Sequence, residues 1–153
     1  YKSPAAPWTF GLSSRLQWRN VDFSFSLRAN LGNYVFNDFE AGASNISKAG
    51  VYTNEYIANR PKNVLGKAWQ TWDCVLSDYF VQNASFVRCD NITLGYTWPT
   101  LLNNNLRLRL YGAVQNPFVI TKYKGLDPEV GGGVDKNIYP RPVTFSLGLV
   151  AQF

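Results

Sequence analysis

Apolar and polar residues alternate along several stretches of this chain, and this alternation constrains the fold more than any other feature. From Trp8 to Trp18 the even positions are mostly apolar, whereas the odd positions are small or polar. A period of two residues is the signature of a β-strand with one apolar and one polar face. The pattern resumes after Arg19 and Asn20 over about residues 21–33. We therefore expect a hairpin of two long strands.

Three further segments show the same alternation. We expect strands at about residues 79–98, 106–116 and 143–153. Within the first of these segments the apolar positions change phase. A β-bulge near Asp90 and Asn91 would restore the two faces, because it inserts one extra residue into a strand.

The connections between the expected strands alternate in length. Short turns follow the first and third strands, and long loops cover about residues 34–78 and 117–142. Outer-membrane β-barrels have this layout, with short periplasmic turns, longer extracellular loops and apolar residues facing lipid. The first long loop shows no clear period and is a plausible place for a local helix.

The expected strands also have the length that a bilayer requires. The ten-residue step from Trp8 to Trp18 spans about 33 Å, or about 23 Å of height at a tilt of 45°. The apolar band of an outer-membrane barrel is roughly 25 Å tall. Strands of soluble β-sandwiches are usually shorter, about 5–6 residues. Strand length therefore favours a membrane barrel.

The composition argues against several classes of protein. The chain has no His, the commonest general base near neutral pH, and its 10 acidic residues form no recognisable constellation, so we expect no enzyme. We expect no cofactor and no metal site. The net charge of +5 is spread singly among apolar residues, which disfavours nucleic acid as a partner. Cys74 and Cys89 have neither redox nor zinc spacing, and both free thiols and a disulfide are open.

Two soluble folds remain as alternatives: a secreted β-sandwich that binds carbohydrate, and a β-barrel that binds nucleic acid. Both would bury the apolar residues that a membrane barrel turns toward lipid. Five strands cannot close a barrel, since the smallest known has about eight, and open sheet edges are not tolerated in lipid. The chain begins at Tyr1 and contains no Met. We therefore expect a processed chain or a fragment, with the other strands outside it.

Four stretches in the second half of the chain form a recognisable set. They read SDYFVQNASFVRCDNITLGYTWP, LRLRLYGAVQNPF, TKYKGLDPE and YPRPVTFSLGLVAQF. In this order they resemble the C-terminal region of SusC/RagA-family TonB-dependent outer-membrane transporters. The resemblance covers Ser77 to Phe153 closely and the residue 8–31 hairpin loosely. It implies an all-β fold: the C-terminal five antiparallel strands of a large, 22-stranded transmembrane β-barrel, incomplete on its own, with the plug domain outside this chain.

The resemblance also implies a function and partners. The whole protein would be an active transporter of the bacterial outer membrane. It would import oligosaccharides or peptides delivered by a SusD-like surface lipoprotein, energised by TonB acting on the absent plug. The expected partners are the upstream remainder of the barrel and its plug, the lipoprotein, TonB, outer-membrane lipids and the cargo, without nucleic acid. Phe153 resembles the terminal aromatic that the barrel-assembly machinery recognises.

Candidate functional residues fall into three groups. Aromatic residues near the strand ends are expected to form lipid-facing girdles: Trp8, Trp18, Tyr96, Trp98 and Phe153. Arginines at polar positions are expected to face the lumen, pairing with carboxylates of the plug or of neighbouring strands more often than steering anionic cargo: Arg15, Arg28, Arg107 and Arg109. Residues of the long loops are candidates for contact with substrate or lid: Trp69, Trp72, Tyr123, Asp127 and Glu129.

A metal site in the second long loop is the weaker interpretation of its acidic residues. Asp127, Glu129 and Asp135 could offer oxygen ligands to a hard cation. Their spacing does not match a calcium loop, and turn chemistry accounts for Asp127 beside Pro128.

Overall fold

The computed structural model describes residues 2–44, 62, 77–101, 106–136 and 139–152. The chain divides into two compact units, which are treated separately. The strand unit comprises Pro7–Leu31, Phe86–Thr121 and Arg141–Phe153. The loop unit comprises Tyr1–Ala6, Gly32–Ser85 and Lys122–Pro140.

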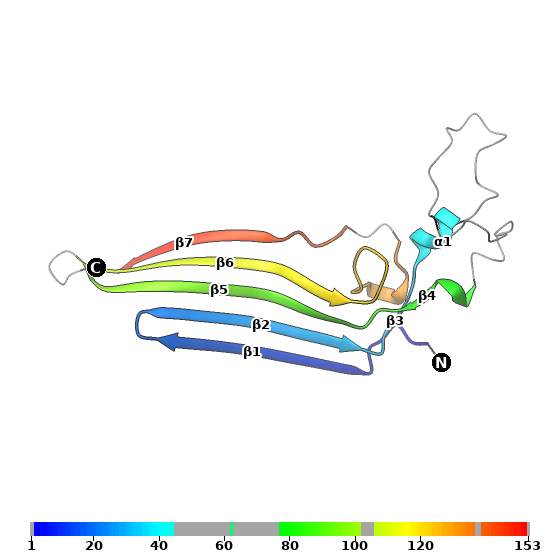
Figure 1. Cartoon of the computed structure of the whole chain (residues 1–153), viewed down its shortest axis with the longest axis horizontal. Helices are drawn as coiled ribbons and strands as arrows, with labels where there is room; N and C mark the ends of the chain where they lie inside the picture. Colours follow the sequence, from blue (N-terminus) through cyan, green and yellow to red (C-terminus); the bar gives the residue numbers. More distant parts are fainter. Residues whose placement is uncertain (1, 45–61, 63–76, 102–105, 137–138, 153) are drawn as a thin grey trace, which may run out of the picture. The chain divides into compact units, whose positions relative to one another are not determined.

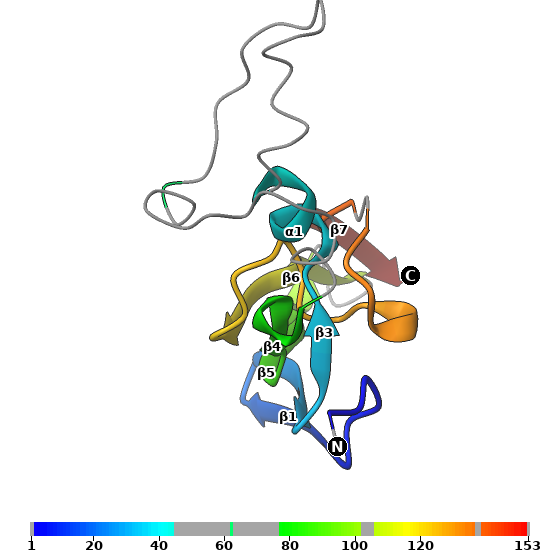
Figure 2. The same cartoon turned by 90° about the vertical axis from the view of Figure 1, so that its right-hand side faces the viewer.

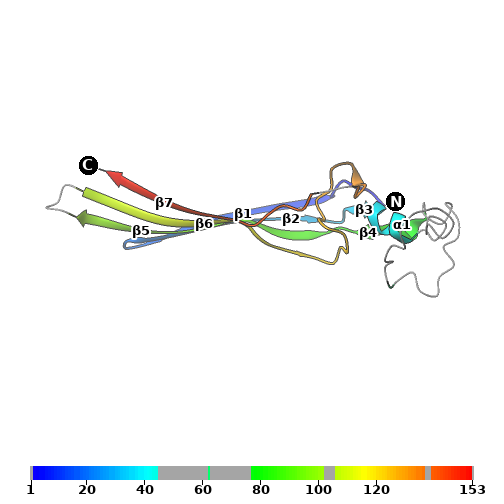
Figure 3. The same cartoon turned by 90° about the horizontal axis from the view of Figure 1, so that it is seen from above.

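The strand unit is one antiparallel sheet of five long strands (Figure 1). Their order in the sheet follows the chain, and Figure 3 shows them as a single layer. The five antiparallel strands expected from the sequence are confirmed. They are β1 (Trp8–Trp18), β2 (Val21–Leu31), β5 (Phe86–Leu101), β6 (Leu106–Thr121) and β7 (Thr144–Gln152).

The expected bulge near Asp90 is confirmed. Leu27 of β2 pairs with Cys89, and Ser26 pairs with Asn91, so Asp90 is the extra residue of β5. The bulge brings the apolar positions on either side of it onto one face, as the phase change in the sequence required. Cys89 is buried and forms no disulfide with any described residue, and Cys74 lies outside the described residues.

Three strand ends differ from those expected. β5 ends at Leu101 instead of residue 98. β2 ends at Leu31 instead of residue 33, because Gly32 adopts a φ of 84° and leaves the extended conformation. β6 continues past residue 116 to Thr121. Asn116 has a φ of 50°, and pairing with β5 is interrupted there and resumes at Phe118. Proline lacks an N–H and is tolerated at such an interruption, so Pro117 does not end the strand.

The expected strand at residues 79–98 is divided among three elements. Its first part forms the 3₁₀ turn η3 (Asp78–Phe80) and the short strand β4 (Val81–Asn83), and β5 begins only at Phe86. The chain turns between β4 and β5 because the Ser85 N–H donates to Asn83 Oδ1, while Ser85 Oγ accepts from the Gly32 N–H. The last strand begins at Thr144 instead of residue 143, and Phe153 lies outside the described residues.

The loop unit contains short elements of regular structure. β3 (Tyr34–Phe36) pairs antiparallel with β4, and the two lie side by side in Figure 2. The helix α1 (Asp38–Ser44) confirms the local helix expected in the first long loop. A second 3₁₀ turn, η4, covers Gly131–Gly133. In the described part of the chain, no helix is long and apolar enough to cross a membrane.

Two small clusters form the core of the loop unit. Val35, Ala84 and Tyr123 make up one cluster, with Val130 packed against it. Ala41 and Phe80 make up the other, with Phe36 packed against it. Residues from both long connections therefore bury one another within this unit.

Candidate functional site

The sheet of the strand unit has one apolar and one polar face. Directly paired residues of neighbouring antiparallel strands point to the same side. One such row joins five strands and is apolar throughout: Leu16, Phe23, Leu94, Gly112 and Leu147. The apolar face formed by this row and its neighbours is left open, since Leu16 is 60% and Leu147 is 82% exposed. A continuous exposed apolar surface usually indicates a site of contact with a membrane or with another protein.

Aromatic residues stand near the two ends of the strands that carry this apolar face. Trp8 begins β1 opposite Leu31, and Trp18 ends the same strand in the row that includes Tyr96. The rings of Tyr96 and Trp98 meet edge to face at 4.6 Å between centroids. Their contact with the lipid interface remains a prediction, as does that of Phe153.

Two of the four predicted arginines pair with carboxylates across the polar face. Arg28 Nε donates to Asp90 Oδ1 at 2.8 Å. Arg109 binds Asp22 with two hydrogen bonds, from Nε at 2.9 Å and from Nη2 at 2.6 Å. Pairing with other strands of the sheet is thus observed for these two arginines. Among the described residues, no carboxylate is hydrogen-bonded to Arg15 or Arg107, although the charge of Arg15 acts on Asp22. The lumen-facing role of all four arginines remains a prediction.

Gly95 makes the Asp22–Arg109 ion pair possible. Asp22 is on β2 and Arg109 on β6, and β5 runs between them with Gly95 directly opposite Asp22. A Cβ at position 95 would lie 2.5 Å from Asp22 Oδ1 and 2.8 Å from Arg109 Nη2. Sequence reasoning missed both Asp22 and Gly95. The available signal was a single acid among the polar positions of the hairpin, with a glycine at a polar position of β5.

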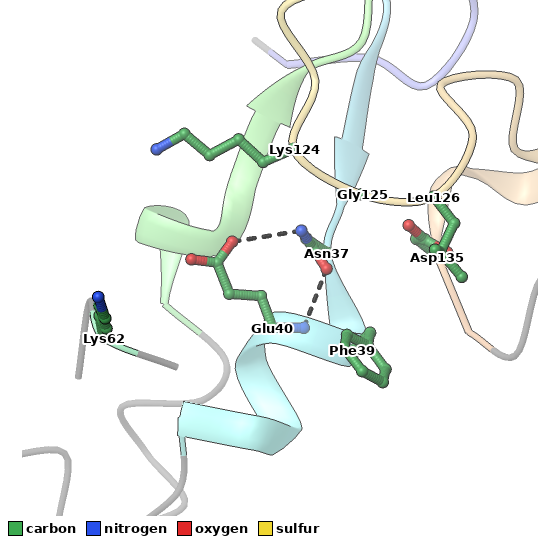
Figure 4. A pocket seen from close by; sticks show the side chains of 8 residues that line it. All are labelled: Asn37, Phe39, Glu40, Lys62, Lys124, Gly125, Leu126 and Asp135. Carbon is green, nitrogen blue, oxygen red and sulfur yellow. Dashed lines mark hydrogen bonds between the residues drawn. The ribbon is translucent and has the colours of Figure 1, made fainter. Parts of the chain in front are cut away.

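The loop unit holds a second network of polar side chains at the start of α1. Asn37 Oδ1 accepts from the Glu40 backbone N–H at 2.9 Å, and Asn37 Nδ2 donates to Glu40 Oε2 at 3.2 Å (Figure 4). Asn37 Oδ1 thus caps the start of the helix. The second bond of a capping box is not formed, because the Asn37 backbone N–H donates to the Phe80 carbonyl and Glu40 meets the Asn37 side chain instead. Gln82 Nε2 also donates to Glu40 Oε2, at 2.7 Å, and ties β4 to the helix. Sequence reasoning missed this site, although Asn-Asp-Phe-Glu has the spacing of a capping box.

A hollow of about 420 Å³ lies beside this network. The side chain of Phe39, which is 71% exposed, forms part of its wall, with the Gly125–Leu126 loop above it in Figure 4. Groups of both charges line it. Its lining residues are Asn37, Phe39, Glu40, Lys62, Lys124, Gly125, Leu126 and Asp135.

The predicted contact residues of the second long loop are mostly engaged in holding that loop. Tyr123 is buried and its hydroxyl donates to Asp135 Oδ2 at 2.6 Å. Burial, followed by the hydrogen bond to Asp135, raises the pKa of the Tyr123 phenol. Asp127 is also buried, and its Oδ1 accepts from the Glu129 N–H at 2.8 Å, which is the turn chemistry expected there.

The structure does not bring the acidic loop residues into one cluster. Within the described ranges, no group of three or more His, Cys, Asp or Glu residues could hold a metal ion. Contact of Tyr123, Asp127 and Glu129 with substrate or lid remains a prediction. Trp69 and Trp72 lie outside the described residues.

Comparisons of sequence and of structure with known proteins both find similar outer-membrane receptors and transporters. No protein-family model matches the chain. The chain is 49% identical to the TonB-dependent receptor SusC of Bacteroides thetaiotaomicron over 100% of its own length. It is 28% identical to a TonB-dependent receptor of Formosa agariphila over 98% of its length. The fold resembles the RagAB peptide importer in its closed-closed state, with a TM-score of 0.76, 28% identity and 99% of this chain covered. Sequence and fold together place this chain in the SusC/RagA family.

The chain spans only part of its relatives in this family. It covers 16% of SusC and 18% of the RagAB chain. The open-open state of RagAB matches as well as the closed-closed state, with a TM-score of 0.75. The five-stranded sheet corresponds to part of the barrel of these transporters, and the expected location in the bacterial outer membrane is confirmed.

Proposed function

We propose that this chain forms part of the barrel wall of an outer-membrane transporter that imports oligosaccharides or peptides. The observation that carries the proposal is the 49% identity to SusC over the whole chain. The exposed apolar face supports it, since barrel strands turn apolar residues to lipid and polar residues inward. In this arrangement the polar face lines the lumen, and strands outside this chain complete a barrel of 22 strands.

The proposal includes three partners beyond the rest of the barrel. A SusD-like lipoprotein would deliver cargo at the extracellular side, where the long connections of the loop unit would lie. TonB would supply energy through the plug, which is outside this chain. Outer-membrane lipids would cover the apolar face. Similarity to SusC and to RagAB over nearly the whole chain supports this set.

The class of cargo divides into two candidates. The identity to SusC supports a receptor of the SusC type and does not itself name a cargo. The RagAB structures are of a peptide importer, and their likeness to this chain supports peptide cargo. Oligosaccharides and peptides therefore both stay as candidates. Neither comparison identifies the relatives as enzymes, and we propose transport without catalysis.

Uptake measurements on cells test the proposal. Deleting the gene for the full-length protein should abolish uptake of either labelled oligosaccharides or labelled peptides, and the intact gene should restore it. An uncoupler that collapses the proton gradient should stop the same uptake in wild-type cells. Unchanged uptake of both cargo classes after deletion would contradict the proposed transport. A protein that fractionates as soluble without detergent would contradict the barrel and favour a carbohydrate-binding sandwich.

A further inference from the structure

A small hollow lies on the polar face of the strand unit, near the start of β6. It measures about 210 Å³ and is lined by Thr97, Arg107, Arg109, Val150 and Gln152. The strand register explains the grouping. Arg109 pairs with Thr97 on one side and with Val150 on the other, and Arg107 pairs with Gln152. Since paired residues share a face, these five side chains surround one spot.

The charges in and around the hollow do not cancel. Two arginines line it, and the one carboxylate hydrogen-bonded to them among the described residues is Asp22, so these three groups carry a net charge of +1. A guanidinium carries five N–H donors. Arg109 directs its Nε and one Nη2 hydrogen toward Asp22, so three of its donors remain. Arg107 is exposed and has no carboxylate partner in the described part of the chain.

Arg109 is held in place before any ligand arrives. Its two hydrogen bonds to Asp22 fix the plane of the guanidinium, and its Cζ lies 4.8 Å from the centre of the Tyr111 ring. Fixed donors lose less entropy on binding than mobile ones. Arg107 is two residues away on the same face, about 7 Å along the strand. Two guanidinium groups at this spacing can reach the two oxygens of one planar carboxylate.

Val150 provides a weakly hydrated wall for such a ligand. It is the one apolar residue at a polar-face position of β7, and this breaks the alternation of the strand. A nearby apolar group lowers the local polarity and strengthens a charge-assisted hydrogen bond. Thr97 and Gln152 add neutral polar groups at the rim.

We propose that this hollow binds one carboxylate group between Arg107 and Arg109. The carboxylate comes either from an acidic side chain of the receptor outside this chain or from anionic cargo. The inference rests on the proposed function in one respect, that the polar face is turned away from lipid. It differs from a general basic lining of the lumen, because it assigns one ligand group to one pair of arginines.

Thermal unfolding of the full-length receptor in mild detergent tests the first source. The variant is R107Q, and the matched control is R15Q. It removes the same charge from the same face outside the hollow, and Arg15 acts on Asp22 only through its charge, without a hydrogen bond. An acidic side chain seated in the hollow predicts that R107Q lowers the unfolding temperature by at least about 2 °C without added anion, while R15Q does not.

Titration with sodium glutarate tests the second source, with sodium chloride at equal ionic strength as the reference. An empty hollow that accepts free carboxylates predicts that glutarate raises the unfolding temperature of the wild type. R107Q should then weaken the apparent affinity for glutarate by about tenfold, the effect of one lost charge-assisted hydrogen bond. R15Q should bind glutarate as the wild type does.

The proposal is overturned if R107Q matches R15Q in both measurements. If R107Q does not accumulate in the membrane, R107K replaces it, since lysine keeps the charge but loses the planar fork. R107K should show a smaller decrease in unfolding temperature or in apparent affinity for glutarate than R107Q would. If R107K behaves as the wild type in both measurements, the proposal is also overturned. Neither measurement requires transport, so a receptor that is folded in membranes but fails both tests refutes the hollow and leaves the proposed function standing.

Discussion

The loop unit covers its own apolar side chains, whereas the strand unit leaves most of its apolar side chains exposed on one side of the sheet. In the loop unit Val35 is 1% and Phe80 is 0% exposed. In the strand unit Phe145 is 77% exposed, although it belongs to a regular strand. The loop unit is therefore stabilised by its own packing. The strand unit depends on whatever covers its apolar face, and under the proposed function that is lipid.

The two units also satisfy their buried acids differently. Asp22 of the strand unit is paired with a charged arginine across an intervening strand. Asp135 of the loop unit accepts a hydrogen bond from the neutral phenol of Tyr123. The Asp22–Arg109 ion pair thus connects two strands that are not direct neighbours, while a neutral donor satisfies Asp135 within the second long connection.

A charge placed on the apolar face should have the largest effect. Leu147→Arg should destabilise the receptor in the membrane by about 2–4 kcal/mol, the cost of an arginine facing lipid near the middle of the bilayer. Ser146→Arg, one residue away on the polar face, is the control and should be tolerated. The folded fraction in outer membranes, measured by heat-modifiable migration on gels, checks both. Equal loss in the two variants would show that the apolar face is not the lipid-facing side.

A side chain at position 95 should have the next largest effect. Gly95→Val should destabilise the receptor by about 1–3 kcal/mol, the usual cost of overpacking, because its Cβ would displace Asp22 and Arg109. Gly11→Val is the matched control, since a Cβ at position 11 meets nothing within 4 Å. Unfolding in detergent measures the difference. Similar stability of both variants would mean that the Asp22–Arg109 pair contributes little.

Removing the Tyr123 hydroxyl should affect the loop unit alone. Tyr123→Phe leaves the carboxylate of Asp135, which is 2% exposed, without this donor. The expected cost is about 1–3 kcal/mol of local stability. Tyr139→Phe is the control because Tyr139 is 87% exposed. Hydrogen exchange should be faster in the loop unit and unchanged in the strands, and faster exchange in both units would contradict their separation.

Alkaline titration should show the smallest effect. The pKa of Tyr123 is raised above its ordinary value of 10.0, so its folded-state contribution is complete below pH 10 and declines as the pH rises further. Up to about pH 11, roughly one unit above the tyrosine pKa, phenolate absorbance of wild type and Tyr123→Phe should coincide. If Tyr123→Phe showed less phenolate absorbance than the wild type below this pH, Tyr123 would be accessible to solvent.

Local patterns in the sequence predicted the long strands well, because the polarity of each strand residue indicates the face of the sheet on which its side chain lies. The phase change that indicates the bulge at Asp90 is such a local pattern. The strand ends were less predictable. Pro117 looked like an end but sits where pairing is interrupted, and the Ser85 side chain turns the chain through a bond to Gly32.

By itself the sequence determined that the chain forms five amphipathic antiparallel strands with two long connections, since alternation depends only on neighbours along the chain. Only the tertiary structure decided which polar residues meet. Asp22 and Arg109 are far apart in sequence and on strands that do not pair, and Gly95 alone leaves room for their contact. Tyr123 and Asp135 meet because the second long connection folds on itself. Such contacts depend on register and chain reversal, which no local period encodes.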